Sequence, residues 1–320
     1  MKILFVATGN NFNYYKGNFS PHVKGPAKAL VNSGVDIDLF QVSSKGLRGY
    51  LKAIPLLRKK IKDTKYDIIH AHYGNCGIIS SISKSKEKLV VSYMGSDLLG
   101  SVNLNGNYTL SGFIITLINK LFSFTSNHYS IVKSEAMRKK IWFNKKVSII
   151  PNGVDFKIFS PADKIKAREE LKLSINKKII LFVGDLESHV KNYKLAEKAV
   201  SLVQKDIQFL SISGVNQNIL NLYYNSADLV LMTSFHEGSP NVIKEAMACN
   251  CPIVSTDVGD VNKITSSTKG CFITSFNPKD IADKINQALL YGKTNGRDNI
   301  EYLDSANIAK KMISLYRDLL

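Results

Sequence analysis

Cysteine is scarce in this chain, and the few cysteines do not form a recognisable pattern. Cys76, Cys249, Cys251 and Cys271 include no pair spaced as Cys-x-x-Cys, and no histidines lie near them at the spacing of a zinc site. Structural zinc sites and disulfide frameworks both depend on such spacing. The sequence therefore predicts reduced thiols, a reducing compartment and no bound metal.

Long apolar runs are also missing. The segment 1–8 carries only Lys2 before a short apolar run and has no small-residue cleavage site, so we expect a first β-strand rather than a signal peptide. The longest apolar stretch, residues 109–125, is interrupted by Asn119 and Lys120, whereas a bilayer span needs about 20 apolar residues. We expect a buried helix there, with a helix lying on a membrane or against a lipid acceptor as the alternative. The protein is expected in the cytoplasm, and that alternative would make it peripheral on the inner face of the membrane.

Acidic residues are few, and their shortage is confined to the first half of the chain. Residues 1–155 hold 22 Lys and Arg against 8 Asp and Glu, whereas residues 156–320 hold 21 against 18. Such an excess favours an anionic partner, namely phospholipid headgroups, a lipid-linked phosphate, an acidic glycan or nucleic acid, with solubility alone as the alternative. We expect no nucleic acid, because no recognition helix or aromatic-interleaved basic patch is evident. The basic run 57–65 could share one surface with the stretch 109–125.

Short runs rich in valine and isoleucine alternate with stretches of helical length, which predicts parallel sheets covered by helices. The expected strands fall in two series, at residues 2–8, 35–41, 67–72, 88–94, 128–133 and 147–151, and then at residues 177–184, 207–214, 228–234, 252–257 and 271–275. The chain therefore reads as two α/β domains in tandem.

The segment between the two series predicts where one domain ends. A Pro-Asn-Gly turn and a second proline lie within residues 151–163, so we expect a hinge at residues 152–161. The domains are then residues 1–153 and 154–304, followed by a helix at 305–320 that packs near the domain junction. Its expected inward face, read from helical spacing, comprises Ala309, Met312, Ile313, Tyr316 and Leu320.

The segment 236–260 is the most informative about chemistry. It follows the expected strand at 228–234, so it lies at a carboxyl end, where open α/β sheets bind ligands. Ser239 suits an N-cap and Pro240 the first helical position, and the free amides of such a helix start attract phosphate. Glu237 in the loop and Glu245 in the second turn could serve different parts of one ligand, because an oxocarbenium-like transition state and sugar hydroxyls both benefit from carboxylates.

These two glutamates, spaced as E-x7-E after a strand, resemble the donor-site signature of family 4 retaining glycosyltransferases. The segments 68–72, 151–155 and 223–234 resemble the same family in the same order. The resemblance implies the GT-B fold, with two Rossmann-like α/β/α domains that face each other across a cleft. It also implies that the first domain binds the acceptor, that the second binds a nucleotide sugar, and that no metal or other cofactor takes part.

The resemblance implies roles for individual residues. Glu237 contacts the transferring sugar, Glu245 holds the ribose hydroxyls, and Lys191 supports the leaving diphosphate, so Glu237 and Lys191 are the expected catalytic residues. The other implied donor-binding positions are Gly17, Gly184, Gly238, Ser239, Pro240 and Asn241.

Some positions depart from the family pattern or remain open. Asp185 stands where relatives usually carry arginine, and Met94 where many carry histidine; Lys194 is one group that could compensate for the missing arginine. On the acceptor side, His72 and Asp97 are candidates for substrate contact, with a hydrogen-bonded structural histidine and a turn-capping carboxylate as the alternatives.

The sequence thus predicts a retaining glycosyltransferase that moves a sugar from a UDP- or GDP-sugar to a glycan or lipid-linked acceptor, as in the synthesis of a bacterial surface polysaccharide. Two other functions stay open. A non-catalytic subunit that binds sugar nucleotides or glycans would fit the loss of functional groups at Asp185 and Met94. A nucleotide-sugar epimerase can share the same architecture.

Overall fold

The computed structural model describes residues 1–8, 21–43, 46–125, 127–142, 146–203 and 206–320. The chain divides into two compact units. The first unit comprises Met1–Ser101, Tyr108–Gly153 and Ser305–Leu320, and the second comprises Val102–Asn107 and Val154–Asp304.

A six-stranded parallel sheet forms the middle of the first unit, in the order β2-β1-β3-β4-β5-β6. Its strands are β1 (Lys2–Thr8), β2 (Asp36–Val42), β3 (Ile68–His72), β4 (Lys88–Ser92), β5 (Tyr129–Val132) and β6 (Val147–Ile149). Because β1 pairs with β2 on one side and β3 on the other, the sheet grows in opposite directions from this point.

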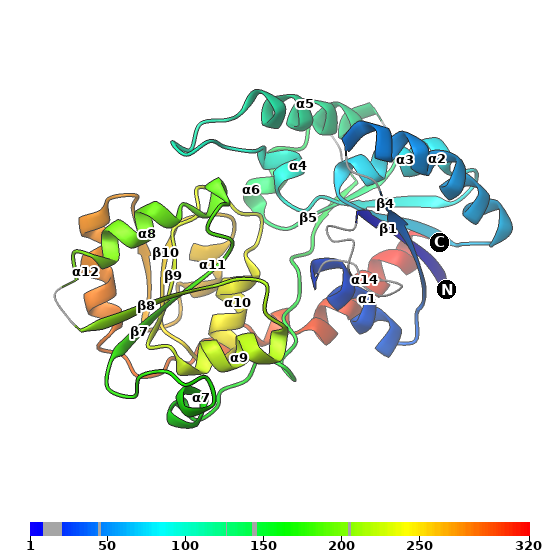
Figure 1. Ribbon diagram of the computed structural model, residues 1–320. Coiled ribbons are helices and arrows are strands. Elements are labelled where there is room, and N and C mark those ends of the chain that lie inside the picture. The colour runs from blue at the N-terminus through cyan, green and yellow to red at the C-terminus, as the bar shows by residue number, and fades with distance from the viewer. Residues whose placement is uncertain (9–20, 44–45, 126, 143–145, 204–205) are drawn as a thin grey trace. The chain divides into compact units, whose positions relative to one another are not determined.

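Helices cover both faces of this sheet (Figure 1). One face carries α1 (Pro21–Asn32) and α14 (Ser305–Leu319), which contact each other. The other carries α2 (Gly46–Asp63), α3 (Gly74–Ser83) and α5 (Leu110–Thr125), with α3 in contact with both α2 and α5. The short helices α4 (Ser96–Leu99) and α6 (Glu135–Arg138) follow β4 and β5.

The second unit repeats this plan with five parallel strands in the order β11-β10-β9-β7-β8. The strands are β7 (Lys178–Val183), β8 (Ile207–Ile212), β9 (Leu229–Met232), β10 (Ile253–Thr256) and β11 (Cys271–Thr274). The α-helices are α7 (Lys164–Glu170), α8 (Tyr193–Val200), α9 (Gln217–Ser226), α10 (Asn241–Ala248), α11 (Val261–Thr265), α12 (Pro278–Ala288) and α13 (Gly296–Asn299), with short 3-10 helices at His189–Lys191 and Glu301–Leu303. The direction of sheet growth reverses between β7 and β9.

Burial of apolar strands holds each unit together. Strands of a parallel sheet that is covered on both faces are apolar along their whole length, and the inner residues of β1, Ile3–Val6, are fully buried. In the second unit, Phe182 and Leu231 of the sheet pack with Ala196 of α8 and Ile285 of α12. All eleven expected strands are present, with ends displaced by at most two residues.

The segment expected to act as a hinge is mostly part of the second unit. Arg297 donates hydrogen bonds to the carbonyl oxygens of Phe156 (3.0 Å) and Phe159 (2.7 Å). Ser160 accepts a hydrogen bond from the Asn225 amide (2.9 Å). The chain passes between the units at Gly153 and Val154, so residues 154–161 are not a free linker.

The long apolar helix α5 is not buried, and the expectation of a buried helix is wrong. Leu110 is 76% exposed and Phe113 57% exposed, whereas Thr116 and Asn119 of the same helix are buried. The inward polar groups are hydrogen-bonded only in part: Asn119 donates to the carbonyl oxygen of Ile115 (2.9 Å), whereas its own Oδ1 has no hydrogen-bond partner among the described residues. Burial of a polar side chain is tolerated when it is hydrogen-bonded in this way.

The last helix, α14, uses a slightly different inward face from the one expected. Ala309, Met312 and Tyr316 are buried as predicted, but Leu320 is 62% exposed and Ile313 is only partly buried. Leu320 lies past the helix end at Leu319, so helical spacing no longer places it on the buried face. Ile308 and Leu315 are buried instead.

Candidate active site

The carboxyl ends of β7 and β9 define the candidate site in the second unit. These two strands flank the point where sheet growth reverses, and ligands of doubly wound sheets bind outside such a point. The loop after β7 runs from Gly184 to the 3-10 helix His189–Lys191, and the loop after β9 leads into α10. The two loops are joined by a backbone hydrogen bond from the Phe235 amide to the Val190 carbonyl oxygen, 2.9 Å.

Lys191 and Glu237, one from each loop, form an ion pair at the centre of this site. The Lys191 Nζ donates to Glu237 Oε1 at 2.6 Å, and the Ser234 hydroxyl donates to the same oxygen at 3.1 Å. The two side chains are 24% and 18% exposed, so the pair is screened only partly from solvent. Gly184 makes room for this lysine, because a Cβ there would come within 3.2 Å of the Lys191 Cγ.

A buried polar cluster lies directly behind the loop. Ser239 donates its hydroxyl to Asp260 Oδ2 (2.7 Å) and accepts from Lys244 Nζ (3.1 Å). Lys244 is fully buried, and burial lowers its pKa to about 8, while burial raises the pKa of Asp260. The cluster therefore links the start of α10, its second turn and the loop after β10.

This cluster explains why Ser239 is not the N-cap of α10. The residue at that position is Pro240, and α10 begins at Asn241, one residue later than expected. The Ser239 hydroxyl is already committed to Asp260 and Lys244, so it does not cap the helix amides. The amino end of α10 still presents its first amides, which lack acceptors within the helix.

Gly259 supports the loop from the other side. Its φ is +65°, and a Cβ on this residue would lie 2.6 Å from the Gly238 carbonyl oxygen and 2.9 Å from that of Glu237. Both distances are shorter than real Cβ contacts allow, and the left-handed conformation also favours glycine. The backbone after β10 thus fixes the position of Glu237 and Gly238.

Glu245 is held by a tyrosine rather than solvated. Its Oε2 accepts a hydrogen bond from the Tyr224 hydroxyl of α9 at 2.8 Å. Burial raises the pKa of Glu245, and the hydrogen bond from Tyr224 lowers it in part. Glu245 is therefore not part of a solvated helix face.

Three buried polar atoms around the loop have no hydrogen-bond partner among the described residues. They are His236 Nε2, Asn241 Oδ1 and Asp260 Oδ1. Buried polar atoms are normally paired, and unpaired ones indicate a missing polar partner. Their position at the start of α10 makes a polar ligand a suitable partner.

Asp185 performs a local structural role. Its carboxylate accepts a hydrogen bond from the Glu187 amide (3.0 Å), and its carbonyl oxygen accepts one from the Ser188 amide (3.1 Å). The residue is exposed, as is Lys194. The only cation that the described part of the second unit pairs with Glu237 is Lys191.

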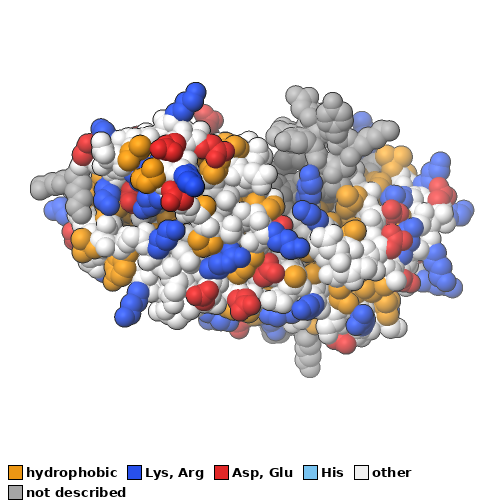
Figure 2. All heavy atoms as spheres, turned by 90° about the horizontal axis from the view of Figure 1, so that it is seen from below, with side chains coloured by type: hydrophobic (Ala, Val, Ile, Leu, Met, Phe, Trp, Pro, Cys, Tyr) orange, Lys and Arg blue, Asp and Glu red, His pale blue; other side chains and the backbone are white. Residues whose placement is uncertain are grey.

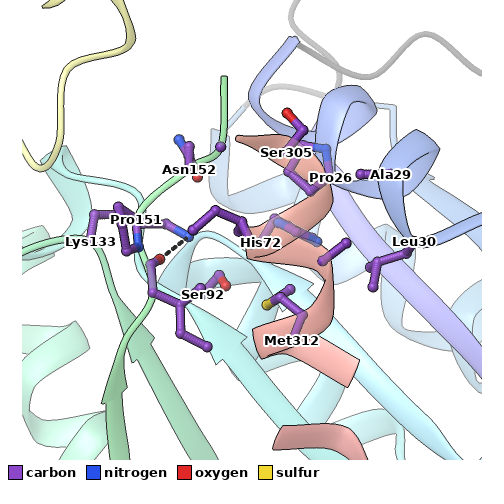
Figure 3. A pocket seen from close by; sticks show the side chains of 14 residues that line it. Pro26, Ala29, Leu30, His72, Ser92, Lys133, Pro151, Asn152, Ser305 and Met312 are labelled. Carbon is purple, nitrogen blue, oxygen red and sulfur yellow. Dashed lines mark hydrogen bonds between the residues drawn. The ribbon is translucent and has the colours of Figure 1, made fainter. Parts of the chain in front are cut away.

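In the first unit, His72 ends β3 and lies at a small cavity of about 20 Å³ (Figure 3). Its ring stacks on His70 with centroids 4.3 Å apart, and it contacts Phe5 at 4.4 Å. Across the cavity, buried Lys133 donates to the Ile150 carbonyl oxygen at 3.4 Å. The enclosed part of this space is large enough for a water molecule.

Asp97 is a buried, turn-capping carboxylate. It accepts hydrogen bonds from the amides of Gly74 (3.0 Å), Met94 (3.0 Å) and Gly95 (2.9 Å). It therefore fixes the backbone after β4 and the start of α3. This geometry supports the structural alternative for Asp97, and Met94 contributes only its amide to it.

The structure thus brings Lys191, Glu237, Gly184 and Gly238–Asn241 together in one unit, with Glu245 on the same helix start. Gly17 lies outside the described residues.

Sequence reasoning missed Ser234, Lys244, Asp260, Gly259 and Tyr224. Only Gly259 had a signal, as a glycine in the loop that follows the expected strand. Among the described residues, no three His, Cys, Asp or Glu side chains cluster as metal ligands would, and no helix has the length and apolar character of a membrane span.

Two family models match successive parts of the chain. "Glycosyl transferase 4-like" matches residues 2–127, and "Glycosyl transferases group 1" matches residues 212–290. The second match contains Glu237, Glu245 and the cluster around Ser239.

Curated relatives agree with these matches. A putative teichuronic acid biosynthesis glycosyltransferase of Bacillus subtilis is 25% identical over 71% of this chain, which spans 62% of that protein's length. An N,N'-diacetylbacillosaminyl-diphospho-undecaprenol alpha-1,3-N-acetylgalactosaminyltransferase of Campylobacter jejuni is also 25% identical, over 90% of this chain and 87% of its own.

Solved structures share the fold over the whole chain. A sucrose-phosphate synthase from Thermosynechococcus elongatus has a TM-score of 0.83 and 18% identity, covering 99% of this chain and 98% of its own. The Anabaena protein Alr3699/HepE, in complex with UDP and glucose, has a TM-score of 0.74 and 15% identity, with 99% and 100% covered. The fold is GT-B, and the chain belongs to the group 1, family 4-like glycosyltransferases.

Proposed function

We propose that this glycosyltransferase takes a nucleotide sugar as donor, transfers the sugar with retention at the anomeric carbon, and needs no metal ion. The observation that carries the proposal is the Lys191–Glu237 pair at the carboxyl ends of β7 and β9, beside the amino end of α10. A UDP-sugar is the first donor to test, because the HepE structure of the same fold contains UDP and glucose.

The donor diphosphate fits the positive groups of this site. Amides at a helix start and a half-buried ammonium both stabilise phosphate, and these are the amino end of α10 and Lys191. We infer that the diphosphate competes with Glu237 for Lys191, which leaves the Glu237 carboxylate free to face the sugar. A lysine so placed stabilises the charge that develops as the phosphate departs, which is the role a metal ion would otherwise have.

In the proposed transfer step, the acceptor replaces the phosphate directly, and no covalent enzyme intermediate forms. The bond from the anomeric carbon to the phosphate oxygen breaks, and the acceptor oxygen forms a bond to the same face of that carbon. The departing phosphate oxygen takes the proton of the acceptor hydroxyl. In this proposal, Glu237 stabilises positive charge on the sugar ring, and Glu245, held by Tyr224, accepts hydrogen bonds from the ribose hydroxyls.

For the acceptor, we propose a glycan or a lipid-linked glycan of a bacterial surface polysaccharide, acted on in the cytoplasm. The Campylobacter relative acts on a diphospho-undecaprenol-linked sugar, and the Bacillus relative is assigned to teichuronic acid synthesis. The basic excess of residues 1–155 suits an acceptor that carries phosphate or acidic sugars.

Thermal melting tests the donor site directly. UDP-, GDP- and ADP-sugars are added in the presence of EDTA to the wild type, to Glu245→Ala, and to Glu170→Ala, which removes an exposed glutamate of α7 as a control. At about 100 times the dissociation constant, one donor should raise the melting temperature of the wild type and the control by roughly 5–10 °C. Glu245→Ala should lose most of that shift.

Any different result of these experiments contradicts part of the proposal. A shift of equal size in Glu245→Ala would place the donor elsewhere, and a shift that EDTA abolishes would show that a metal takes part. Donor binding without transfer to any acceptor would favour a non-catalytic binding subunit, which the acidic residue at Asp185 motivates. Interconversion of the donor sugar without acceptor would indicate an epimerase.

A further inference from the structure

The outward face of α5 in the first unit is apolar along its whole length. Leu110, Phe113, Ile114, Leu117 and Ile118 are between 37% and 76% exposed. Their spacing of three and four residues places them on one side of the helix. Leu121 and Phe124 extend the same exposed row.

The polarity of α5 is the reverse of that of an ordinary surface helix. A surface helix normally turns its apolar stripe toward the core and its polar residues toward water. In α5, the polar side chains of Thr116, Asn119 and Ser123 are buried. The hydroxyls of Thr116 and Ser123 donate to carbonyl oxygens of their own helix, at 2.8 and 2.7 Å. The helix thus turns its polar side chains inward and leaves its apolar side chains exposed on its outer side.

Basic and aromatic groups border this face. The Lys120 ammonium of α5 lies 5.7 Å from the ring centroid of Trp142, which is 39% exposed. The exposed Lys139 and Lys140 follow α6, two residues before that tryptophan. Tryptophan and lysine beside an apolar surface are the groups that settle at a membrane–water boundary.

The neighbouring helices extend the same surface. Ile82 of α3 is 52% exposed, and the Arg58 guanidinium of α2 donates to its carbonyl oxygen at 3.0 Å. On α2, Leu47 and Leu51 are 74% and 55% exposed. The helix also carries six basic residues and only one acidic residue, at Arg48, Lys52, Arg58, Lys59, Lys60, Lys62 and Asp63. As Figure 1 shows, α2, α3 and α5 lie on the same side of the sheet.

We propose that this surface, formed by α5 with the exposed edges of α2 and α3, docks on an anionic lipid bilayer, with the apolar row of α5 inserted among the headgroups. Apolar insertion combined with a basic border is the usual basis for binding of interfacial helices to membranes containing anionic lipids. On the face seen from below in Figure 2, Lys, Arg, Asp, Glu and hydrophobic side chains are interspersed. The proposal goes beyond the transfer reaction, because it concerns the binding of the enzyme to a membrane surface.

The charge of the border argues against a second copy of the chain as the occupant. A two-fold symmetric interface places the same patch on both partners. Two copies joined through α5 would gather Lys120, Lys139 and Lys140 of both chains around one interface. Repulsion between like charges opposes such pairing, whereas anionic headgroups neutralise it.

Vesicle flotation tests the proposal with the full chain and no donor, so its outcome is independent of the proposed reaction. Vesicles of phosphatidylcholine alone are compared with vesicles of equimolar phosphatidylcholine and phosphatidylglycerol. The double variant Ile114→Gln/Leu117→Gln removes apolar groups from the α5 row. The control Ile175→Gln/Leu202→Gln removes two side chains of similar exposure from the second unit.

We expect the wild type and the control to float with the anionic vesicles and the α5 variant to partition roughly tenfold less, with melting temperatures unchanged. Lys139→Gln/Lys140→Gln should also weaken flotation, and added salt should then matter less. Equal flotation of the α5 variant and the control, or no flotation of the wild type, would overturn the proposal. So would a dimer in light scattering that the α5 variant dissolves, because the face would then join two copies.

Discussion

Single residues decide the chemistry of the site, and the pairing of Lys191 with Glu237 is the clearest example. Neither loop alone predicts the contact, since the residues are 46 positions apart. Their types and strand-end positions did indicate a common site, because loops at the carboxyl ends of β7 and β9 must meet beside the same sheet edge. We propose that Lys191 exchanges between Glu237 and the donor phosphate, and mutation of either residue tests this step.

Replacing Glu237 with glutamine should lower turnover by about tenfold to a thousandfold, because the amide keeps the shape but loses the charge that faces the sugar. The fold should be little affected, since the lost ion pair is partly exposed and such pairs contribute about 1 kcal/mol or less. Steady-state kinetics with the donor found by thermal melting measures the first effect, and the melting temperature measures the second. Unchanged turnover would remove Glu237 from the reaction.

Contacts among loop residues are the part of the site that sequence patterns do not reveal. Ser239 looked like an N-cap because serine before proline is typical of a helix start. The buried Lys244 is 5 residues away and Asp260 is 21 residues away, yet both bind the Ser239 hydroxyl. A lysine on a short amphipathic helix is normally predicted to face solvent. The burial of Lys244 depends on tertiary contacts, which residue spacing alone does not predict.

At the scale of elements, regular structure was predictable and orientation was not. The strands were found because a strand buried on both faces is apolar throughout and short. The helix α5 was also found, but an apolar run predicts only that a helix avoids water, not which side does so. The structure buries its polar stripe, Thr116, Asn119 and Ser123, and exposes its apolar side, which the apolar run did not predict.

The loop after β10 makes a second prediction at this scale. Gly259→Ala should weaken donor binding about tenfold or more, because its Cβ would push against the carbonyl oxygens of Glu237 and Gly238. Gly214→Ala is the matched control, since Gly214 has a similar φ of +71° but nothing within 4 Å of its Cβ. Both variants carry the strain of a left-handed alanine, so the difference between their donor affinities isolates the loop contact. Equal affinities would show that the loop adapts.

At the scale of the whole molecule, the second unit is inserted into the first. Apart from the short segment Val102–Asn107, the chain enters the second unit at Val154 and leaves it at Asp304, and these two residues lie side by side in a parallel bridge. It then returns to the first unit as α14, where Tyr316 and His70 share a hydrogen bond of 2.5 Å. The sequence predicted the helix and a position near the junction, but it did not predict α1 as a partner, since no local pattern specifies what an amphipathic helix packs against.

Removing residues 305–320 should therefore destabilise the first unit selectively. The deletion uncovers the apolar partners of Ile308, Met312 and Tyr316 on the first unit, and loss of several buried side chains costs a few kcal/mol each. Hydrogen exchange should show protection lost in β1 and β3 but retained in β7 and β9. Deletion of residues 317–320 serves as the control, because Arg317, Asp318 and Leu320 are exposed. Equal loss in both units would mean that the two fold as one.

The inserted arrangement also sets the order in which the protein can mature on the ribosome. Residues of the first unit are translated first, yet α14 is translated only after the whole second unit. Domains generally fold as they emerge, so the second unit can complete its sheet while the surface around α1 and His70 still waits for Tyr316. The nascent chain thus holds an unfinished apolar surface throughout synthesis of the second unit, and this is the period in which a chaperone would be needed.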